Sequence, residues 1–374
     1  MDYINYYLIM IIMNKLNILV LVPSFAEKGP IIVAKNIAKY SKNNSIKYTF
    51  ISLRTNSNSI IKENEFNFYE IGMKKIPFKK DINKIIDILD KLNPDIVHAH
   101  GFWPTFITSK YLSNYITVTT LHNNPKEDYI YNYGVLLGNL MVYFLKKHLK
   151  NFNSVIAISD YVKSILKKMC LDNINVIYNG VEDKLSEVDT SKVYSKNKEI
   201  NLITVAALNK IKNISYALEI IKELKNNDFN IKYIIIGNGP QKKEIKRLIN
   251  KKDLNDVVRL LGELPREEVF EYLFKSDIFI FTSKSEGFGL AVAESMMMKT
   301  PAIVNDIPVM HELIDNYRNG IIAQNTEDFI EGIDYVTKNL SDLSVNARKQ
   351  YEDNFSVEKM AKKYEIKYIE LLGE

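Results

Sequence analysis

Two glutamates flank a glycine-containing turn late in the chain. Glu286 begins the sequence Glu-Gly-Phe-Gly, which includes Gly287 and Gly289, and Glu294 lies on the helix that we expect to begin near Leu290. Glycine lets the backbone approach a ligand closely, and the N–H groups at the start of a helix attract an anion. Carboxylates accept hydrogen bonds from sugar hydroxyls. The spacing therefore indicates a site for a ligand with phosphate in its middle and hydroxyls at both ends, as in a nucleotide sugar.

Three histidines form a second group of candidates. His98 and His100 lie on one short predicted strand, residues 95–100, so we expect only one of them to face a ligand. His122 ends the next predicted strand and is followed by two asparagines. The three histidines could be considered as zinc ligands, but no carboxylate at a suitable spacing completes a set, and we expect no metal site. His122 and His100 are the candidates for a role in ligand binding.

These residues lie at the ends of predicted strands that alternate with helices. Such alternation indicates parallel sheets with right-handed crossovers, which bind ligands beyond the carboxyl ends of their strands. His100, His122 and Asn179 occupy such ends in the first half of the chain. A second alternating series begins near residue 201. The sequence therefore predicts an α/β protein with two Rossmann-like domains.

The length of 374 residues is comfortable for two domains. We predict a first domain over residues 1–182, a polar linker over residues 183–199 and a second domain over residues 200–356. The final helical stretch, residues 357–374, follows the second domain and is expected to return to the first.

The first twelve residues are apolar but too short to span a bilayer, and they lack the features of a signal peptide. Met13 leads directly into the first predicted strand, so residues 1–12 are expected to precede the native start. Cys170 is the only cysteine, which excludes an intramolecular disulfide and fits a reducing cytoplasm.

Charge is unevenly distributed along the chain. The 50 Lys and Arg residues against 45 Asp and Glu give too small an excess to suggest nucleic acid as a partner. Residues 1–184 contain 23 basic and 15 acidic residues, so this half is near +8 and the remainder near −3. A basic half attracts phosphorylated substrates or anionic lipid. The loop Lys74–Lys80 surrounds an apolar tip with lysines, so we expect it to contact an anionic membrane, with a merely solvated loop as the alternative.

The chain resembles the retaining glycosyltransferases of family 4. The resemblance extends from about Lys15 over nearly the whole chain, and its main motif is the pair Glu286 and Glu294, spaced as E-x7-E. Other family-like segments are PDIVHAHG, AISDYVKSIL, VIYNGVE, IIGNGP and SDIFIFTSKSEGFGL. The resemblance implies the GT-B fold, in which two Rossmann-like domains face each other across a cleft. It also implies a nucleotide diphosphate sugar as donor and no metal or other cofactor.

The resemblance implies roles for individual residues of the second domain. Glu286 would contact hydroxyls of the donor sugar, and Glu294 would hold the ribose. The amides of Phe288, Gly289 and Leu290 would cradle the diphosphate.

In the first domain, His122 would approach the donor sugar or the acceptor, and the Gly29 loop would lie near the acceptor. His100 and Asn179, which end their strands, are the further candidates on this acceptor side.

The cationic part of the implied donor site departs from the family pattern. The family places an arginine and a lysine in this region, and both bind the diphosphate. Lys212 stands at the lysine position, but Ala207 replaces the arginine, and Lys210 is the available substitute. A lysine lacks the planar fork of an arginine. Gly237 is a further donor-site candidate; its Gly-x-Gly lacks the third glycine of a dinucleotide site, so NAD is not expected.

These observations predict a retaining glycosyltransferase that moves a sugar from a nucleotide diphosphate sugar to a glycan or lipid-linked acceptor. We expect it to act in cell-surface polysaccharide or glycolipid synthesis, in the cytoplasm and peripherally on the inner face of the membrane. One alternative is a nucleotide-sugar 2-epimerase on the same fold. Another is a non-catalytic nucleotide-sugar-binding scaffold subunit, which the loss of the arginine at Ala207 would favour.

Overall fold

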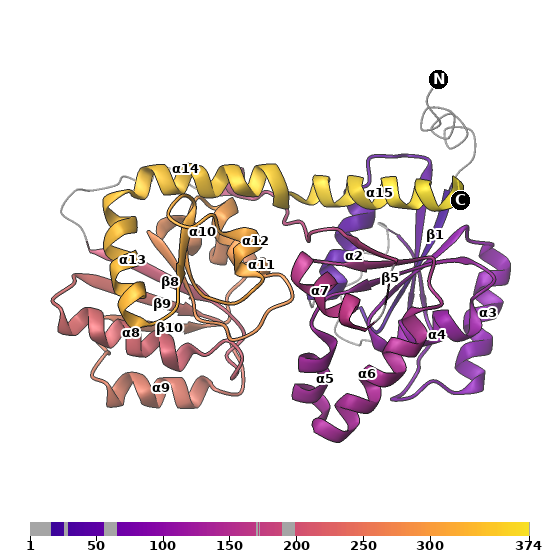
Figure 1. Ribbon diagram of the computed structural model, residues 1–374, viewed down its shortest axis with the longest axis horizontal. Helices are drawn as coiled ribbons and strands as arrows, with labels where there is room; N and C mark the ends of the chain where they lie inside the picture. The colour runs from indigo at the N-terminus through magenta and orange to yellow at the C-terminus, as the bar shows by residue number, and fades with distance from the viewer. Residues whose placement is uncertain are drawn as a thin grey trace. The chain divides into compact units, whose positions relative to one another are not determined.

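The chain forms two compact units (Figure 1). The computed structural model describes residues 16–25, 29–55, 66–169, 171, 173–188 and 199–373. Unit 1 runs to Gly180 and includes Val357–Glu374, and unit 2 is Val181–Ser356. The boundary therefore lies two residues before the predicted one. Of the predicted linker, residues 189–198 lie outside the described residues, as do residues 1–12.

In its described residues, unit 1 contains a parallel sheet of seven strands in the order β3-β2-β1-β4-β5-β6-β7. The strands are β1 (Leu16–Val22), β2 (Ile46–Ser52), β3 (Asn67–Glu70), β4 (Ile96–His100), β5 (Ile116–Leu121), β6 (Ser154–Ala157) and β7 (Ile174–Val176). Alternate side chains of β1 serve two cores: Ile18 and Val20 join one cluster, and Leu19 and Leu21 join the other. Because both faces are covered, this strand is a continuous apolar run.

Helices cover both faces of this sheet. They are α2 (Gly29–Lys39), α3 (Lys79–Leu92), α4 (Phe102–Tyr111), α5 (Pro125–Tyr133), α6 (Val135–Leu149), α7 (Asp160–Lys168) and α15 (Val357–Gly373). The C-terminal helix α15 packs against α2 and places Met360, Tyr364 and Tyr368 in the core cluster of Ile18 and Val20. It is therefore part of unit 1, although unit 2 precedes it in the chain. Among the helices described, none has both the length and the apolar content needed to cross a membrane.

In its described residues, unit 2 contains a parallel sheet of six strands in the order β10-β9-β8-β11-β12-β13. The strands are β8 (Ile200–Val205), β9 (Ile231–Ile236), β10 (Val258–Gly262), β11 (Ile278–Phe281), β12 (Ala302–Asn305) and β13 (Gly320–Ala323). The α-helices are α8 (Ile214–Asn226), α9 (Lys242–Lys251), α10 (Arg266–Lys275), α11 (Leu290–Met297), α12 (Met310–Leu313), α13 (Thr326–Lys338) and α14 (Leu340–Gln350). One core cluster joins α8, α9 and α13 to the central strands.

The strand order reverses once in each sheet, between β1 and β4 in unit 1 and between β8 and β11 in unit 2. At such a point the two connections leave in opposite directions, which creates a crevice at the carboxyl ends of the strands where ligands bind. The predicted residues lie there. Gly29 follows β1 and His100 ends β4, whereas Lys212 follows β8 and Glu286 follows β11.

Candidate active site

In unit 2, hydrogen bonds tie the loop after β8 to the loop after β11. The backbone N–H of Lys284 donates to the carbonyl of Ile211 at 2.8 Å. The Thr282 hydroxyl donates to the carbonyls of Lys212 and Asn213 at 3.2 and 3.1 Å. These bonds connect the two strand ends on either side of the reversal point, so side chains from both loops share one site.

Lys212 and Glu286 meet in this site. The Lys212 ammonium forms a short ion pair with Glu286 Oε1, and the two side chains are only 23% and 14% exposed. The Asn209 side chain shapes the loop by accepting hydrogen bonds from the N–H groups of Ile211 and Lys212 at 3.0 and 3.1 Å. The structure thus brings together the carboxylate expected to bind the sugar and the cation expected to bind the diphosphate.

The turn into α11 depends on glycine. Gly289 has φ = 106°, and a Cβ there would lie 2.8 Å from Met310 Cε. The Phe288 side chain is buried edge-on against Phe355 at 5.4 Å, so it faces the core and only its backbone can face a ligand. Helix α11 begins at Leu290 with no acidic residue in its first turn and no side-chain cap. Its first N–H groups, which lack intrahelical acceptors, therefore suit an anion.

Glu294 lies in the second turn of α11 and is 9% exposed. Its Oε1 pairs with a guanidinium nitrogen of Arg266, which is the first residue of α10 and lies over the Phe270 ring at 5.0 Å. Sequence reasoning missed Arg266. Its position just beyond the carboxyl end of β10 could have indicated it, because ligand-binding residues in parallel sheets concentrate there. The cations that contact the two glutamates are thus Lys212 and Arg266.

The remaining predicted residues of unit 2 lie in the neighbouring loops. Ala207 and Lys210 are both exposed in the loop after β8. Gly237 has φ = 140°, and a Cβ there would lie 1.9 Å from the Ala206 carbonyl oxygen. A Cβ at Gly239 would similarly lie 2.5 Å from the carbonyl oxygen of Leu208. Close packing of the two loop backbones therefore accounts for both glycines without a ligand.

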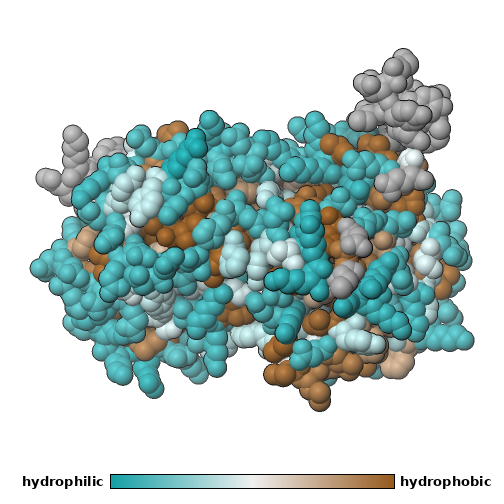
Figure 2. Space-filling view, in the orientation of Figure 1, coloured by the Kyte–Doolittle hydropathy of each residue, from teal (hydrophilic) through white to brown (hydrophobic). Residues whose placement is uncertain are grey.

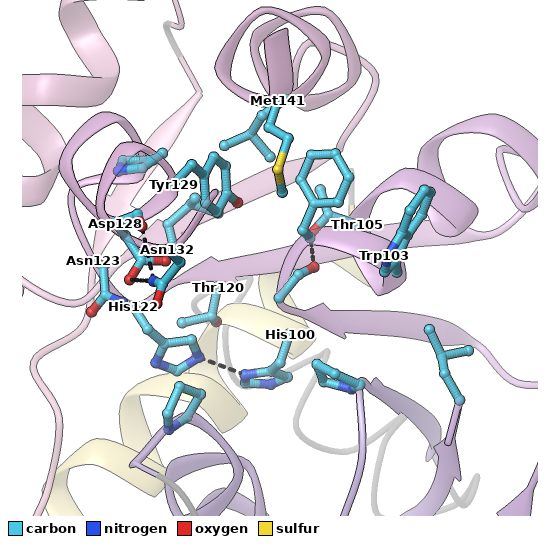
Figure 3. Close-up of a pocket in the computed structure, with 18 of the residues that line it drawn as sticks. His100, Trp103, Thr105, Thr120, His122, Asn123, Asp128, Tyr129, Asn132 and Met141 are labelled. Carbon is cyan, nitrogen blue, oxygen red and sulfur yellow. Dashed lines mark hydrogen bonds between the residues drawn. The ribbon is translucent and has the colours of Figure 1, made fainter. Parts of the chain in front are cut away.

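In unit 1, a pocket of about 260 Å³ lies beyond the carboxyl ends of β4 and β5 (Figure 3). Its walls come from the loops after β1, β2, β4 and β5 and from α4, α5 and α6. Residues that give it polar or aromatic character are Arg54, His100, Trp103, His122, Asp128 and Tyr129. In Figure 3, His100 and His122 lie on one side of the pocket, and Met141 of α6 lies across from them.

His100 and His122 are directly bonded. His100 Nδ1 lies 2.9 Å from His122 Nε2, and the rings are stacked with centroids 5.2 Å apart. Burial lowers the pKa of His122 to about 3 and holds the pKa of His100 well below its ordinary value, so both rings are neutral near pH 7. His100 Nε2 is buried and has no hydrogen-bond partner among the described residues. Because one shared proton lies between the rings, one of the outer nitrogens, His100 Nε2 or His122 Nδ1, is a donor and the other an acceptor.

His98 lies beneath this pair on the same face of the sheet, and of the two histidines of the strand only His100 lines the pocket. Residues two apart on a strand point to the same side, and the His98 and His100 rings are 4.2 Å apart. His98 Nδ1 bonds the Tyr368 hydroxyl at 2.7 Å, and His98 Nε2 bonds the Thr120 hydroxyl at 2.8 Å. Both ring nitrogens are therefore engaged, and the described residues contain no group of three or more His, Cys, Asp or Glu side chains suited to a metal.

We expect these histidines to make the protein unstable in acid. Burial, reinforced by repulsion from His122, lowers the pKa of His98 from 6.5 to about 3. Between these values the unfolded state binds a proton that the folded state does not, so the free energy of unfolding falls as pH decreases. At about pH 5 the cost from His98 alone is about 2 kcal/mol. Urea unfolding at several pH values measures it.

The His98→Asn variant should show a shallower loss of stability with decreasing pH, because one titrating group is removed. His311→Asn is the matched control, since His311 is 56% exposed and pairs with Asp306 at the surface. Equal slopes for the wild type and His98→Asn would contradict this prediction.

The other two predicted residues of unit 1, Gly29 and Asn179, differ in their position relative to the pocket. Gly29 is the first residue of α2, and its neighbour Pro30 lines the pocket. Asn179 is 3% exposed, does not line the pocket and has no partner for Oδ1 among the described residues. It precedes Gly180, whose N–H lies 3.0 Å from Met360 Sδ of α15.

Two ionisable residues of the pocket were missed at the sequence level. Arg54 follows β2, a strand that the sequence pattern did not reveal. Asp128 lies in the first turn of α5, and burial raises its pKa although hydrogen bonds from Asn123 and Asn132 act in the opposite direction. A cation, a carboxylate and two neutral histidines thus supply hydrogen-bonding groups to a pocket whose other walls are largely apolar.

Comparison with known proteins covers both units. Residues 187–354 match the family of glycosyl transferases group 1, and residues 33–185 match Glycosyltransferase Family 4. The O-antigen biosynthesis glycosyltransferase WclY of Escherichia coli is 28% identical over 368 residues, which cover 94% of this chain and 98% of that protein. An alpha-monoglucosyldiacylglycerol synthase of Acholeplasma laidlawii is 29% identical over 186 residues, 49% of this chain and 46% of that protein.

Among solved structures, Anabaena HepE in complex with UDP is similar with a TM-score of 0.79 and 14% identity, over 94% of this chain and 99% of that chain. HepE has also been solved with UDP and glucose. At this identity the likeness shows the fold, and that fold is GT-B.

Proposed function

Since the chain belongs to the family 4 glycosyltransferases, we propose that it transfers a sugar with retention from a nucleotide diphosphate sugar to a glycan or lipid-linked acceptor. The observation that carries this proposal is the Lys212–Glu286 pair beside the start of α11, with Glu294 one turn further on. The relatives support the acceptor classes, because one acts in O-antigen synthesis and another is a glycolipid synthase. HepE has been solved with UDP and glucose, which makes UDP-glucose the first donor to test.

On the donor side, the start of α11 and Lys212 would hold the diphosphate, since helix N–H groups and an ammonium both stabilise negative charge. Glu286 would orient the sugar through its hydroxyls. Glu294 would hold the ribose, and Arg266 would pair with Glu294 until the ribose replaces it. Arg266 also supplies a guanidinium in a site where Ala207 leaves none.

In the transfer step, the acceptor oxygen bonds to the anomeric carbon while the bond from that carbon to the diphosphate oxygen breaks. The acceptor hydroxyl proton passes to the departing phosphate oxygen, on the same face of the sugar, which retains the configuration. Negative charge grows on the diphosphate, where Lys212 and the α11 amides would stabilise it. The neutral His100–His122 pair would hydrogen-bond a reacting hydroxyl without carrying charge.

A donor screen tests this function directly. The protein is incubated with UDP-, GDP- or ADP-sugars, with and without a panel of glycan and lipid-linked acceptors, and the products are separated by mass. We expect transfer with one donor class and at most slow hydrolysis without acceptor. A donor sugar epimerised in the absence of acceptor would instead identify a 2-epimerase.

We predict that transfer needs no divalent metal. Lys212 and the N–H groups at the start of α11 are available to stabilise the negative charge of the diphosphate. Treatment with EDTA should therefore leave the rate within about twofold of the untreated value, a change that corresponds to less than about 0.5 kcal/mol. Loss of turnover in EDTA, restored by Mg²⁺ or Mn²⁺, would show that this prediction is wrong.

We further propose that unit 1 docks on anionic membrane, with the loop Lys74–Lys80 contributing. Ile76 and Phe78 at its tip are 57% and 58% exposed, and lysines flank them. Each lysine near an anionic surface contributes about 1 kcal/mol, and salt screens this attraction. We expect binding to vesicles with anionic lipid to weaken about tenfold when Lys74 and Lys75 are replaced by glutamine. If vesicle binding depends neither on salt, nor on anionic lipid, nor on Lys74 and Lys75, then the loop does not contribute to membrane docking.

A further inference from the structure

The hairpin formed by α5 and α6 exposes apolar side chains to an unusual extent. In the part of the chain that the structure describes, fifteen large apolar residues are exposed, and eight of them lie on this hairpin. They are Tyr131, Tyr133, Val135, Leu136, Leu137, Leu140, Tyr143 and Phe144. Leu136, at the tip, is 90% exposed. Figure 2 shows this apolar surface as a continuous brown area at the lower edge of the view, where Figure 1 places α5 and α6.

The hairpin is firmly built, so its exposed face is a defined surface. Gly138 of α6 packs against the backbone of α5, where a Cβ would lie 2.7 Å from Ile130 Cα. The base of α6 is anchored on α4, because the His148 ring packs on Phe106 with centroids 4.6 Å apart and bonds the Ser109 hydroxyl at 2.9 Å. The base is therefore held in unit 1, and the apolar tip projects from it.

The composition of the hairpin fits an anionic bilayer better than a protein partner. No acidic residue occurs from Tyr129 to Ser159, and three lysines, at 146, 147 and 150, follow the apolar face. Tyrosines at positions 131, 133 and 143 border it. Apolar residues flanked by tyrosine and lysine are typical of helices that lie in a membrane interface. The 15 residues of α6 extend only about 22 Å, less than the hydrocarbon thickness of a bilayer.

The same hairpin also forms a wall of the histidine pocket. Tyr129, Tyr133, Met141 and Leu145 line that pocket together with His100 and His122. A second groove is lined by Phe106 of α4 and by the exposed residues Ile76 and Phe78. Trp103 lines both. An amphiphile with its apolar part at the hairpin could therefore place its polar head in the pocket.

We propose that the α5–α6 hairpin inserts its tip into the interface of an anionic bilayer and that the acceptor is an amphiphile held in that bilayer. The second part rests on the proposed function. In this arrangement the hairpin brings the pocket to the level of the lipid head groups, and the acceptor reaches His100 and His122 without leaving the membrane. The lysine-flanked loop Lys74–Lys80 shares a groove with α4 and would add electrostatic attraction to the bilayer.

Vesicle binding tests the insertion. The purified full chain is mixed with vesicles of phosphatidylcholine alone or with phosphatidylglycerol added, and bound protein is measured by co-sedimentation. Replacing Leu136 and Leu140 together by asparagine should weaken binding to the anionic vesicles about tenfold or more. In the matched control, asparagine replaces Val345 and Ile366, which are 61% and 46% exposed elsewhere on the protein. This variant should bind the vesicles like the wild type.

The depth to which the hairpin tip inserts into the bilayer is measured with a single tryptophan as fluorescent reporter. Trp103 is the only tryptophan, so a Trp103→Phe, Leu136→Trp variant carries one reporter at the tip. We expect brominated lipids in anionic vesicles to quench most of its emission. Unchanged emission, equal binding of the asparagine and control variants, or a stable dimer that the asparagine variant converts to monomer would each overturn the proposal.

Two further results separate this inference from the proposed function. Vesicle binding through the hairpin together with no sugar transfer from any donor would disprove the function and leave the docking intact. Transfer to a water-soluble oligosaccharide at a rate that neither vesicles nor the Leu136 and Leu140 substitutions alter would support the function and disprove the amphiphilic acceptor. UDP binding, measured by calorimetry, should be the same in all variants, because the donor residues lie in unit 2.

Discussion

Glu286→Gln should lower the rate of sugar transfer by up to about thirtyfold while leaving the affinity for free nucleoside diphosphate almost unchanged. The hydroxyls that Glu286 would bind are on the sugar, and hydrogen bonds to a charged group contribute about 1.5–3 kcal/mol against about 1 for a neutral one. Orientation of the anomeric carbon matters most in the transition state, so turnover should fall more than donor affinity. The substitution also releases Lys212 from its ion pair, so any small change in the affinity for nucleoside diphosphate should be a gain and not a loss.

Glu294→Gln should behave differently from Glu286→Gln. Its expected partner is the ribose, which the donor and the free nucleoside diphosphate share, so both should bind about tenfold more weakly. Both variants should stay folded, because glutamine has nearly the size and shape of glutamate and leaves no cavity.

Calorimetric titration with nucleoside diphosphate, beside turnover with the complete donor, separates the two roles. Glu271→Gln is the matched control, since Glu271 pairs with Lys275 on the exposed face of α10. Equal weakening of nucleoside diphosphate binding in Glu286→Gln and Glu294→Gln would contradict this division of roles.

The two glutamates could be predicted from sequence because they lie within one strand–loop–helix segment, where glycine positions and spacing are local information. Their partners could not. Lys212 is 74 residues from Glu286, and Arg266 is 28 residues from Glu294, and each contact depends on the strand order of the folded sheet. The sequence placed Lys212 near a phosphate, through the resemblance, but it gave no reason to pair it with a carboxylate.

Strands with a clear apolar run were predicted, and those without one were missed. Strand β3 is four residues long at the sheet edge and mostly exposed, so it has no distinct apolar pattern. In β2, Lys47 and Thr49 interrupt the apolar residues although most of the strand is buried. The omission of β2 also hid Arg54, which follows it and lines the histidine pocket.

The histidines show a different limit. His98 and His100 could be identified as candidates from their strand, but their burial and their neighbours come from distant segments. Tyr368, which bonds His98, lies 270 residues away on α15. Its hydroxyl could be placed under β4 only once the C-terminal helix was seen to pack on unit 1.

His122→Gln should reduce turnover about a hundredfold, the usual effect of removing one hydrogen-bonding group aimed at a reacting oxygen. Glutamine can place its amide near the position of Nε2, so the contact with His100 is retained while Nδ1, the nitrogen left for a ligand, is lost. Affinity for nucleoside diphosphate should be unchanged, because the residues proposed to bind the nucleotide lie in unit 2.

His100 should act as a positioning residue for His122, and its substitutions can separate this role from packing. His100→Asn places an amide near Nδ1 and keeps the bond to His122, whereas His100→Gln places it near Nε2 and loses that bond. We expect the rate of transfer to fall about tenfold in the glutamine variant, which corresponds to one hydrogen bond of about 1.4 kcal/mol, and much less in the asparagine variant.

The pH dependence of the rate completes this test. Because burial lowers the pKa of His122 to about 3 and also lowers that of His100, neither ring gains a proton between about pH 5.5 and 8. The wild-type kcat/KM should therefore show no step near 6.5, the ordinary pKa of histidine, in this range. A variant that merely disturbed packing would lower the rate at every pH and affect His100→Asn and His100→Gln alike. The contrary result is a step in the wild-type kcat/KM near pH 6.5 that is absent in His122→Gln. That result would mean that His122 is charged during the reaction, and the prediction that the His100–His122 pair is neutral would be wrong.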